Sequence, residues 1–125
     1  MWQKGRRVTT NFQISEFLCK CCGAGADIVK QELLDKLQVI RNEYGIPMVV
    51  DCGYRCPSHN VAIGAPDSAH LTGEAADILD VTGKLKDFCR SEKLEVWGLW
   101  AEAYESTPTW VHLQIRPAVN RIFKP

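Results

Sequence analysis

The stretch SAHLTGEAADI, residues 68–78, decides the fold because it turns the chain and leads into a strand. Gly73 suits the turn, since glycine adopts backbone conformations that other residues avoid. Polar and apolar residues then alternate through residue 81, which predicts a strand with Asp77 on the face opposite its apolar neighbours. His70 and Asp77 would then approach each other across the turn and could share a metal ion. A polar loop before a half-buried strand would explain the same residues without a metal ion. The rest of the sequence must therefore distinguish these two interpretations.

The segment DIVKQELLDKLQVIRNEYG, residues 27–45, predicts the longest helix. Asp27 is the expected N-cap, Gly45 is the expected stop, and Pro47 prevents the helix from continuing. Apolar side chains recur at the spacing of one helical face, namely Leu33, Leu37, Ile40 and Tyr44, with Leu34 beside them. We therefore expect a helix that packs against the core and carries no chemistry.

Shorter segments complete the expected fold. Residues 47–52 predict a buried strand, and residues 82–93 predict a second helix. Residues 94–102 and 109–115 predict two strands of a hairpin. The tail, residues 116–125, contains two prolines and is expected to wrap the surface. Together these elements predict an α+β fold, with an antiparallel sheet flanked by helices.

Composition narrows the class of protein. Fifteen basic residues balance 15 acidic ones, which argues against a nucleic-acid-binding or membrane-binding surface. No apolar run has the length needed for membrane insertion. The opening residues 1–10 are positively charged without an apolar segment behind them, so no signal peptide is predicted and synthesis in the cytoplasm is expected. The length fits a single domain over residues 1–125, with a monomer as the default.

The cysteines allow two interpretations. Cys19, Cys21 and Cys22 cluster in CKCC, while the other three cysteines are dispersed. A disulfide framework is not expected without an export signal. Reduced thiols are one interpretation, and a structural zinc ion held by the cluster, with Cys56 or His59, is the other. Because the spacing fits a paired zinc motif only loosely, the sequence favours reduced thiols.

Two histidines and one aspartate form a candidate metal site. On its strand, His112 shares a face with Trp110 and Gln114. One histidine among apolar neighbours is more often structural than metal-binding. Imidazole and carboxylate groups suit zinc, however, and three protein ligands leave a fourth position for water. His70, Asp77 and His112 therefore merit attention as a set.

Four separated motifs carry a family resemblance. SAHLTGEAADI is similar to the signature S-x-H-x-x-G-x-A-x-D, and residues 51–70, DCGYRCPSHNVAIGAPDSAH, are similar to the stretch S-G-Y-R-x-P-x-x-N. WVHLQ, residues 110–114, resembles the strand that carries a last histidine, and NFQISEFLCKC, residues 11–21, resembles an N-terminal segment. Taken in their order along the chain, they resemble the zinc D-alanyl-D-alanine peptidase family, including its short phage and bacterial members. Its members cut peptidoglycan peptides on a scaffold shared with the Hedgehog-type zinc domain.

The resemblance implies a zinc peptidase. Its zinc ion would be held by His70, Asp77 and His112, and a zinc-activated water would attack an amide bond in a peptidoglycan-derived peptide. Arg55 matches the arginine of that family that faces the substrate, where a guanidinium can bind a carbonyl or carboxylate oxygen. A loop-bracing arginine is the alternative for Arg55.

The chain departs from the family pattern at two positions. Many members place an acidic general base three residues before the last histidine, where this chain has Thr109. Glu102 and Glu105 are then the candidate catalytic carboxylates, with Glu102 preferred. If the strands turn at residues 105–106, Glu102 lies opposite Thr109 or its neighbour. Cys52 replaces a serine of the family, and it is expected to fill that space rather than act as a nucleophile.

Two further residues could support the site. Ser68 and Gln114 are expected to orient the zinc ligands, or simply to line the site.

Three functions remain open. A peptidase without a signal peptide fits a phage or prophage lysis protein released by a holin, or a cytoplasmic recycling enzyme. The main alternative is a zinc-binding domain without catalysis, used for recognition or stability, and Thr109 is the feature that favours it. A third option is an interaction module built on CKCC, which predicts more than one zinc ion per chain and unfolding when Cys21 and Cys22 are changed.

Overall fold

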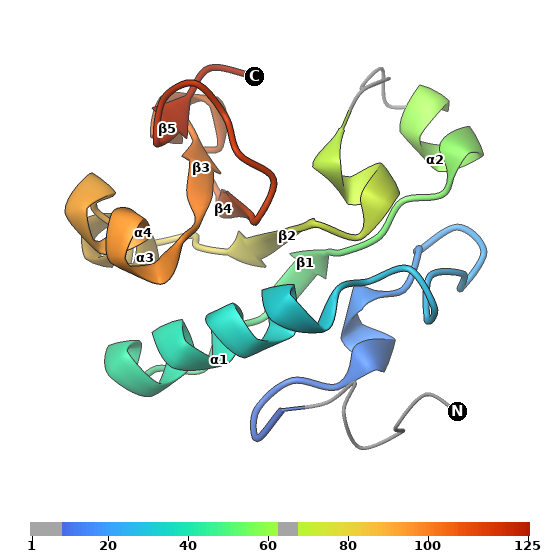
Figure 1. Cartoon of the computed structure of the whole chain (residues 1–125), viewed down its shortest axis with the longest axis horizontal. Helices are drawn as coiled ribbons and strands as arrows, with labels where there is room; N and C mark the ends of the chain where they lie inside the picture. Colours follow the sequence, from blue (N-terminus) through green and yellow to red (C-terminus); the bar gives the residue numbers. More distant parts are fainter. Residues whose placement is uncertain (1–8, 63–67) are drawn as a thin grey trace.

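The computed structural model describes residues 9–62 and 68–125 (Figure 1). The charged opening segment and the centre of the motif at residues 51–70 therefore lie outside the described residues. The elements in chain order are η2 Ile14–Phe17, α1 Gln31–Tyr44, β1 Val50–Cys52, α2 Pro57–Ala62, η3 Ala69–Thr72, β2 Ala75–Leu79, α3 Lys84–Phe88, α4 Ser91–Trp97, β3 Trp100–Glu102, η4 Tyr104–Ser106, β4 Trp110–Gln114 and β5 Ile122–Phe123.

The strands form one mixed sheet in the order β1-β2-β4-β3-β5. The α+β class is thereby confirmed, and the first four strands pair antiparallel as expected. The tail lies at the surface as expected, since none of residues 116–125 is buried, but it also forms a strand that the sequence did not predict, and this strand, β5, pairs parallel with β3. The Ala101 N–H donates to the Arg121 carbonyl oxygen (2.9 Å), and the Ala103 N–H donates to that of Phe123 (2.6 Å). The tail therefore satisfies the backbone groups of β3, which would otherwise lie at the edge of the sheet.

The helix α1 packs the expected apolar face against the core. Its Leu33, Leu34, Leu37 and Ile40 side chains are fully buried, and Gly45 ends it in the left-handed conformation (φ 75°). The helix begins at Gln31 rather than at Asp27, because the Ile28 and Val29 N–H groups bond to the Gly25 carbonyl oxygen in a separate turn. In Figure 1, α1 runs below the sheet, with α3 and α4 at one end and α2 at the other.

The segment after β2 differs most from expectation. The expected helix over residues 82–93 is two helices, and the expected strand over residues 94–102 begins only at Trp100. Leu94 and Trp97 are both buried, and their spacing of three residues suits a helix face better than a strand face. Gly98 then ends α4 with a φ of 72°, so only the residues after it can extend into β3.

Asp80 caps the start of α3. Its Oδ1 accepts a hydrogen bond from the Leu85 N–H (3.0 Å), and its Oδ2 accepts from the Lys86 N–H (3.0 Å) and lies 3.2 Å from Lys86 Nζ. Burial opposes ionisation of this carboxyl group, but the hydrogen bonds outweigh it and hold the pKa of Asp80 below its usual value. The carboxylate therefore stabilises this helix in its charged form.

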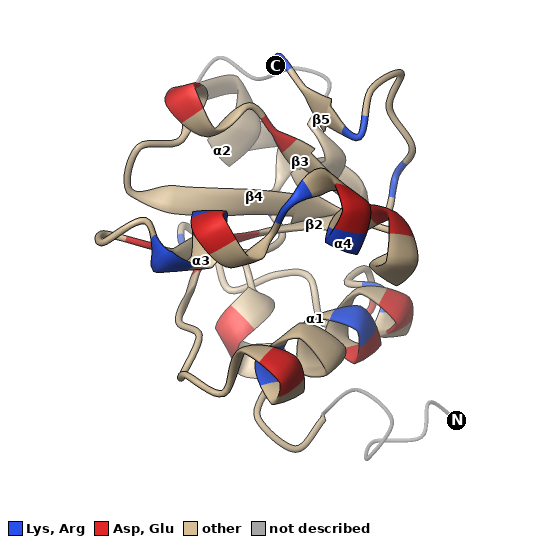
Figure 2. Cartoon of the chain, turned by 90° about the vertical axis from the view of Figure 1, so that its left-hand side faces the viewer, with Lys and Arg blue, Asp and Glu red and all other residues tan. Residues whose placement is uncertain are grey.

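Charges of both signs are interspersed on the helices. Figure 2 shows basic and acidic segments following one another along α1 and α4. This pattern agrees with the equal numbers of acidic and basic residues in the chain. Within residues 9–62 and 68–125, none of the helices combines the length and the apolar character needed to cross a bilayer.

Candidate metal centre

The three side chains predicted as metal ligands lie together, and both histidines face the same carboxylate oxygen of the aspartate. The sheet register places Asp77 of β2 directly opposite His112 of β4, and η3 brings His70 to the same point. Asp77 Oδ1 lies 2.9 Å from His112 Nδ1 and 3.2 Å from His70 Nε2. All three residues are buried. The turn between His70 and Asp77 is made by Gly73, which ends η3 with a φ of 71° as the sequence suggested.

Hydrogen bonding fixes which nitrogen of His70 carries a proton. His70 Nδ1 lies 2.6 Å from the Gly53 carbonyl oxygen, which can only accept a hydrogen bond. The proton is therefore on Nδ1, and Nε2 presents a lone pair toward Asp77 Oδ1. Nε2 is fully buried and has no hydrogen-bond donor among the described residues. Two electron-rich atoms thus face each other in the protein interior, which is unfavourable unless a cation lies between them.

The ring of His112 is oriented in the same manner. Gln114 Nε2 donates to the Arg116 carbonyl oxygen (2.8 Å), so its Oε1 faces His112 Nε2 at 2.8 Å. Nε2 must then carry a proton, and Nδ1 is the nitrogen that faces Asp77. Gln114 therefore selects the tautomer that leaves Nδ1 available to a metal ion. Hydrogen bonds of this kind orient metal-binding histidines.

Electrostatics favours the same arrangement. Burial opposes ionisation of Asp77, but the two imidazole rings that face its carboxyl group outweigh burial and lower the pKa of Asp77 below the usual range. Burial likewise opposes charging of His112, while the adjacent Asp77 raises its pKa. An ionised carboxylate between two imidazole rings is a donor set that fits zinc. The residues present therefore fit the metal that the sequence suggested.

Cys52 is a neighbour of this centre that sequence analysis did not weigh as a ligand. Its Sγ and the ligand atoms of His70 and Asp77 all lie within 4.8 Å of one another. Burial raises the pKa of the Cys52 thiol, and the Arg55 Nε–H donates to its sulfur (3.4 Å). The register β1–β2, which pairs Cys52 with Asp77, is the signal that would have placed it here.

Arg55 is buried beside the centre and held by two neighbours. One neighbour is Cys52, described above. The other is Asn60, whose Oδ1 accepts a hydrogen bond from Arg55 Nη1 (3.2 Å). Arg55 Nη2 lies 3.9 Å from Asp77 Oδ2. Asn60 is 1% exposed and was not singled out, although it stands in the motif GYRCPSHN. Arg55 therefore both braces this region and points one side of its guanidinium toward the carboxylate.

A hollow of about 390 Å³ opens next to the centre. Its wall contains both basic and acidic groups together with one aromatic ring, contributed by Lys20, Asp51, Cys52, Arg55, His59, Asp77 and Trp110. Because Arg55 and Asp77 are among them, a molecule in the hollow would touch the arginine and the predicted metal ligand at once.

The two candidate carboxylates differ in position. Trp100 pairs with Gln114 and Ala101 with Leu113, so the next step of the register places Glu102 opposite His112, not opposite Thr109 or its neighbour as expected. The connection is longer than a tight turn, because η4 lies within it. Glu102 Oε2 is 3.7 Å from His112 Nδ1. Glu105 is exposed in η4, and no contact within the described residues joins it to the three predicted ligands.

Ser68 and Gln114 act on the histidines in different ways. Ser68 Oγ accepts a hydrogen bond from the His70 N–H (3.1 Å) and caps η3, so it positions the backbone of His70. Gln114 contacts the ring of His112 directly. Their geometry agrees with the expected supporting role, which stays a prediction until a metal is measured.

Two histidines and an aspartate converge beside a hollow lined by Arg55, and such a donor set suits a zinc ion that keeps one position open. The model of the family described as Peptidase M15 matches residues 10–114. The chain therefore belongs to the Peptidase M15 family, whose members are zinc-dependent peptidases. The family expected from the motifs is confirmed. A comparison with curated proteins finds no match.

Proposed function

We propose that the chain is a zinc peptidase that hydrolyses an amide bond in a peptidoglycan-derived peptide. The observation that carries this proposal is the buried His70 Nε2, which makes no hydrogen bond among the described residues and faces the same Asp77 oxygen as His112 Nδ1 does. Membership of the Peptidase M15 family supports the zinc-dependent chemistry. The peptide substrate follows from the motifs SAHLTGEAADI and GYRCP, which resemble those of D-alanyl-D-alanine peptidases.

A zinc ion held by His70, Asp77 and His112 would supply a polarised substrate carbonyl group and a water molecule of lowered pKa. Arg55 lines the hollow beside Asp77 and carries a fixed positive charge. Its guanidinium would bind the carbonyl oxygen of the scissile amide or a carboxylate of the peptide. Lys20 on the wall adds a second positive charge for a substrate that carries a carboxylate.

Glu102 is the general base in this proposal. Its carboxylate lies 3.7 Å from His112 Nδ1, next to the point where the three ligands converge. The side chain is 23% exposed, so water reaches it. A carboxylate held there would accept a proton from water and return it to the leaving amine. Thr109 is exposed and carries no group that can do so at neutral pH.

The Glu102→Gln variant tests this role. We expect cleavage of purified muropeptides to fall about 10²–10⁴-fold, while the zinc content stays at the wild-type level, because the amide keeps the shape and loses the base. Glu105→Gln is the matched control and should cleave as the wild type does. Product release would be followed by chromatography and zinc by atomic emission. Unchanged cleavage by Glu102→Gln would remove Glu102 from the mechanism.

A second function is favoured by Thr109 alone. A chain that lacks an acidic residue at this position would bind zinc without hydrolysing a peptide and would serve recognition or stability. The same experiment separates the two functions, because the second predicts bound zinc in the wild type and no new termini in muropeptides. Cleavage by the wild type would exclude it.

A further inference from the structure

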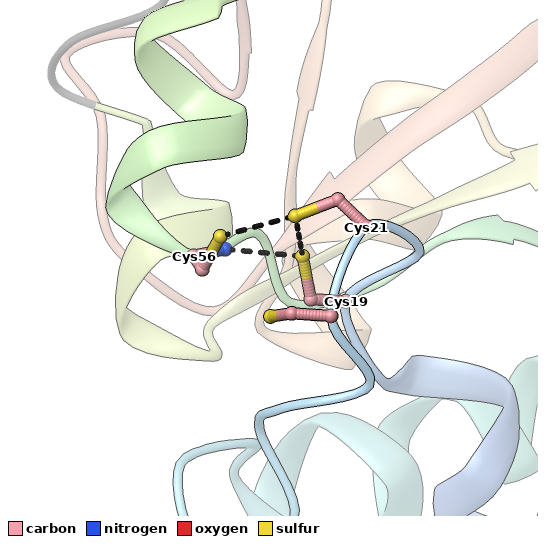
Figure 3. A group of neighbouring side chains, drawn as sticks. Cys19, Cys21 and Cys56 are labelled. Carbon is pink, nitrogen blue, oxygen red and sulfur yellow. Dashed lines mark hydrogen bonds between the residues drawn. The ribbon is translucent and has the colours of Figure 1, made fainter.

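Four cysteines gather at a point separate from the histidine centre. Figure 3 shows that Cys19 and Cys21, from the segment after η2, face Cys56 at the start of α2. The Cys21 sulfur lies 3.5 Å from that of Cys19 and 3.3 Å from that of Cys56. With Cys22 included, the four sulfur atoms all lie within 4.8 Å of one another. None of these cysteines is in a disulfide bond.

This spacing suits a tetrahedral zinc ion. Zn–S bonds of about 2.3 Å place neighbouring sulfur atoms of a tetrahedron about 3.8 Å apart. The observed separations are near that value before any ion is added. Burial does not explain the gathering, because only Cys19 is buried, whereas Cys21 and Cys22 are exposed. The three-dimensional arrangement therefore reverses the preference for unliganded thiols that the sequence alone suggested.

The backbone around the cluster is arranged for thiolate ligands. The Cys56 N–H points at the Cys19 sulfur (3.4 Å), and the His59 N–H points at the Cys56 sulfur (3.4 Å). Hydrogen bonds of this kind stabilise and orient sulfur ligands of a metal. The segment itself closes on a short turn, because the Cys19 N–H donates to the Ala24 carbonyl oxygen (2.8 Å) and the Gly23 N–H donates to that of Cys19 (2.7 Å).

We propose that Cys19, Cys21, Cys22 and Cys56 bind a second, structural zinc ion. The four thiols would lose their protons to solvent as four Zn–S bonds form. The ion would join the turn at residues 19–24 to the first residues of α2. His59, whose Nδ1 lies 3.5 Å from the Cys19 sulfur, is the neighbouring side chain that could exchange with one thiolate.

The site would also hold one wall of the hollow beside the histidine centre. Lys20 lies between the clustered cysteines, and both Lys20 and His59 line the hollow together with Arg55. Arg55 directly precedes Cys56 in the chain. A metal ion at the cysteines would therefore fix Lys20 and Arg55 relative to Asp77, without touching the substrate itself.

Metal content tests the proposal independently of activity. We expect wild-type protein purified under reducing conditions to contain two zinc ions per chain. Cys21→Ser and Cys56→Ser should each contain one, and Asp77→Asn should also contain one because it loses the other site. Cys89→Ala is the control, since Cys89 is buried away from the cluster, and it should keep two. One ion in the wild type, unchanged in Cys21→Ser, would overturn the proposal.

Cobalt substitution identifies the ligands. Co²⁺ bound to several thiolates absorbs strongly in the near ultraviolet through sulfur-to-metal charge transfer, whereas a histidine–carboxylate site does not. We expect this band in the wild type and in Asp77→Asn, and its loss in Cys56→Ser. Absence of the band from cobalt-loaded wild type would overturn the proposal.

A measurement on the wild type alone covers the case in which the cysteine variants do not fold. Thiols held by zinc react slowly with a chromogenic disulfide reagent until a chelator is added. We expect the chelator to release four fast-reacting thiols at the cluster, identified by peptide mapping. Four thiols that react at the same rate with and without chelator would contradict the site, as would a disulfide between Cys21 and Cys56.

Discussion

The histidine centre and the cysteine cluster are built in opposite ways. Asp77 and His112 stand on paired central strands. Hydrogen bonds to the Gly53 carbonyl oxygen and to Gln114 set the positions of the ring protons of His70 and His112, respectively. The cysteines stand on a turn and a helix start, where the contacts between the two parts of the cluster run through sulfur atoms and the Cys56 N–H. The first arrangement exists before an ion arrives, whereas the second would gain much of its order from the ion. Removing metal should therefore abolish catalysis at the histidine centre but leave its fold intact, whereas at the cysteine cluster it should disorder the local fold.

The largest effect is expected from Asp77→Asn. This change removes the carboxylate that both histidines face, so zinc leaves the histidine centre and peptide cleavage falls by about 10³-fold or more, since a metal supplies several kcal/mol of transition-state stabilisation. The sheet register should persist, and the melting temperature should change little. Activity assays and circular dichroism melts measure both. Unfolding of Asp77→Asn at room temperature would show that the centre is not preorganised.

Gly53→Ala tests the link between the two regions. An added Cβ would lie 2.5 Å from the Phe17 Cα, and the Gly53 carbonyl oxygen holds His70. Forcing these backbones apart should cost about 1–3 kcal/mol of unfolding free energy and weaken zinc binding at both points. Urea melts and zinc titrations measure these changes. Gly45→Ala is the control, since Gly45 has open space around it and lies at the end of α1, and it should leave zinc affinity unchanged.

Gln114→Leu tests preorganisation by a single hydrogen bond. Without the acceptor for the His112 Nε2 proton, the ring loses its tautomer, and zinc affinity at the histidine centre should fall about 10–100-fold. Competition with a chromophoric chelator measures the affinity. Gln114→Glu keeps an acceptor and should bind zinc nearly as the wild type does. Equal affinities for all three proteins would mean that the ring needs no orientation.

The smallest effect is expected at Asp80, which lies outside both metal regions. Because its pKa is lowered in the folded protein, its carboxylate contributes stability above its ordinary pKa of 3.8, and this contribution is lost as the pH falls below that value. Asp80→Asn should cost about 1–2 kcal/mol at pH 7, and its deficit should shrink under acid conditions. Melts between pH 7 and pH 3 measure the difference. A deficit that is constant with pH would point to packing instead of charge.

Local patterns predicted the elements better than they predicted their pairing. The leucine spacing placed α1 and the alternation around Asp77 placed β2, because both are periodicities that a short window contains. The motifs placed His70, Asp77 and His112 in one candidate set, and they converge in the structure. Leu94–Trp97 was misassigned because a short apolar run fits a helix and a strand equally well.

Contacts between segments far apart in the chain could not be predicted from the sequence. The position of Glu102 depends on the register between β3 and β4. The short helix η4 in their connection changes the register expected for a tight turn, and the three residues Tyr104–Ser106 are too few for a sequence pattern to predict a helix. The approach of Cys56 to CKCC depends on how η2 packs near β1, where the Tyr54 N–H donates to the Phe17 carbonyl oxygen (2.7 Å). No spacing rule for paired zinc motifs describes four cysteines brought together in this way.

The parallel pairing of β5 with β3 ties the proposed base to the tail of the chain. The strands that carry Asp77 and His112 pair with each other without the tail. The strand that carries Glu102 has its second neighbour in β5. Loosening the tail should therefore disturb the proposed base while the predicted metal ligands stay paired, so the ability to use a metal can be lost separately from the ability to bind it.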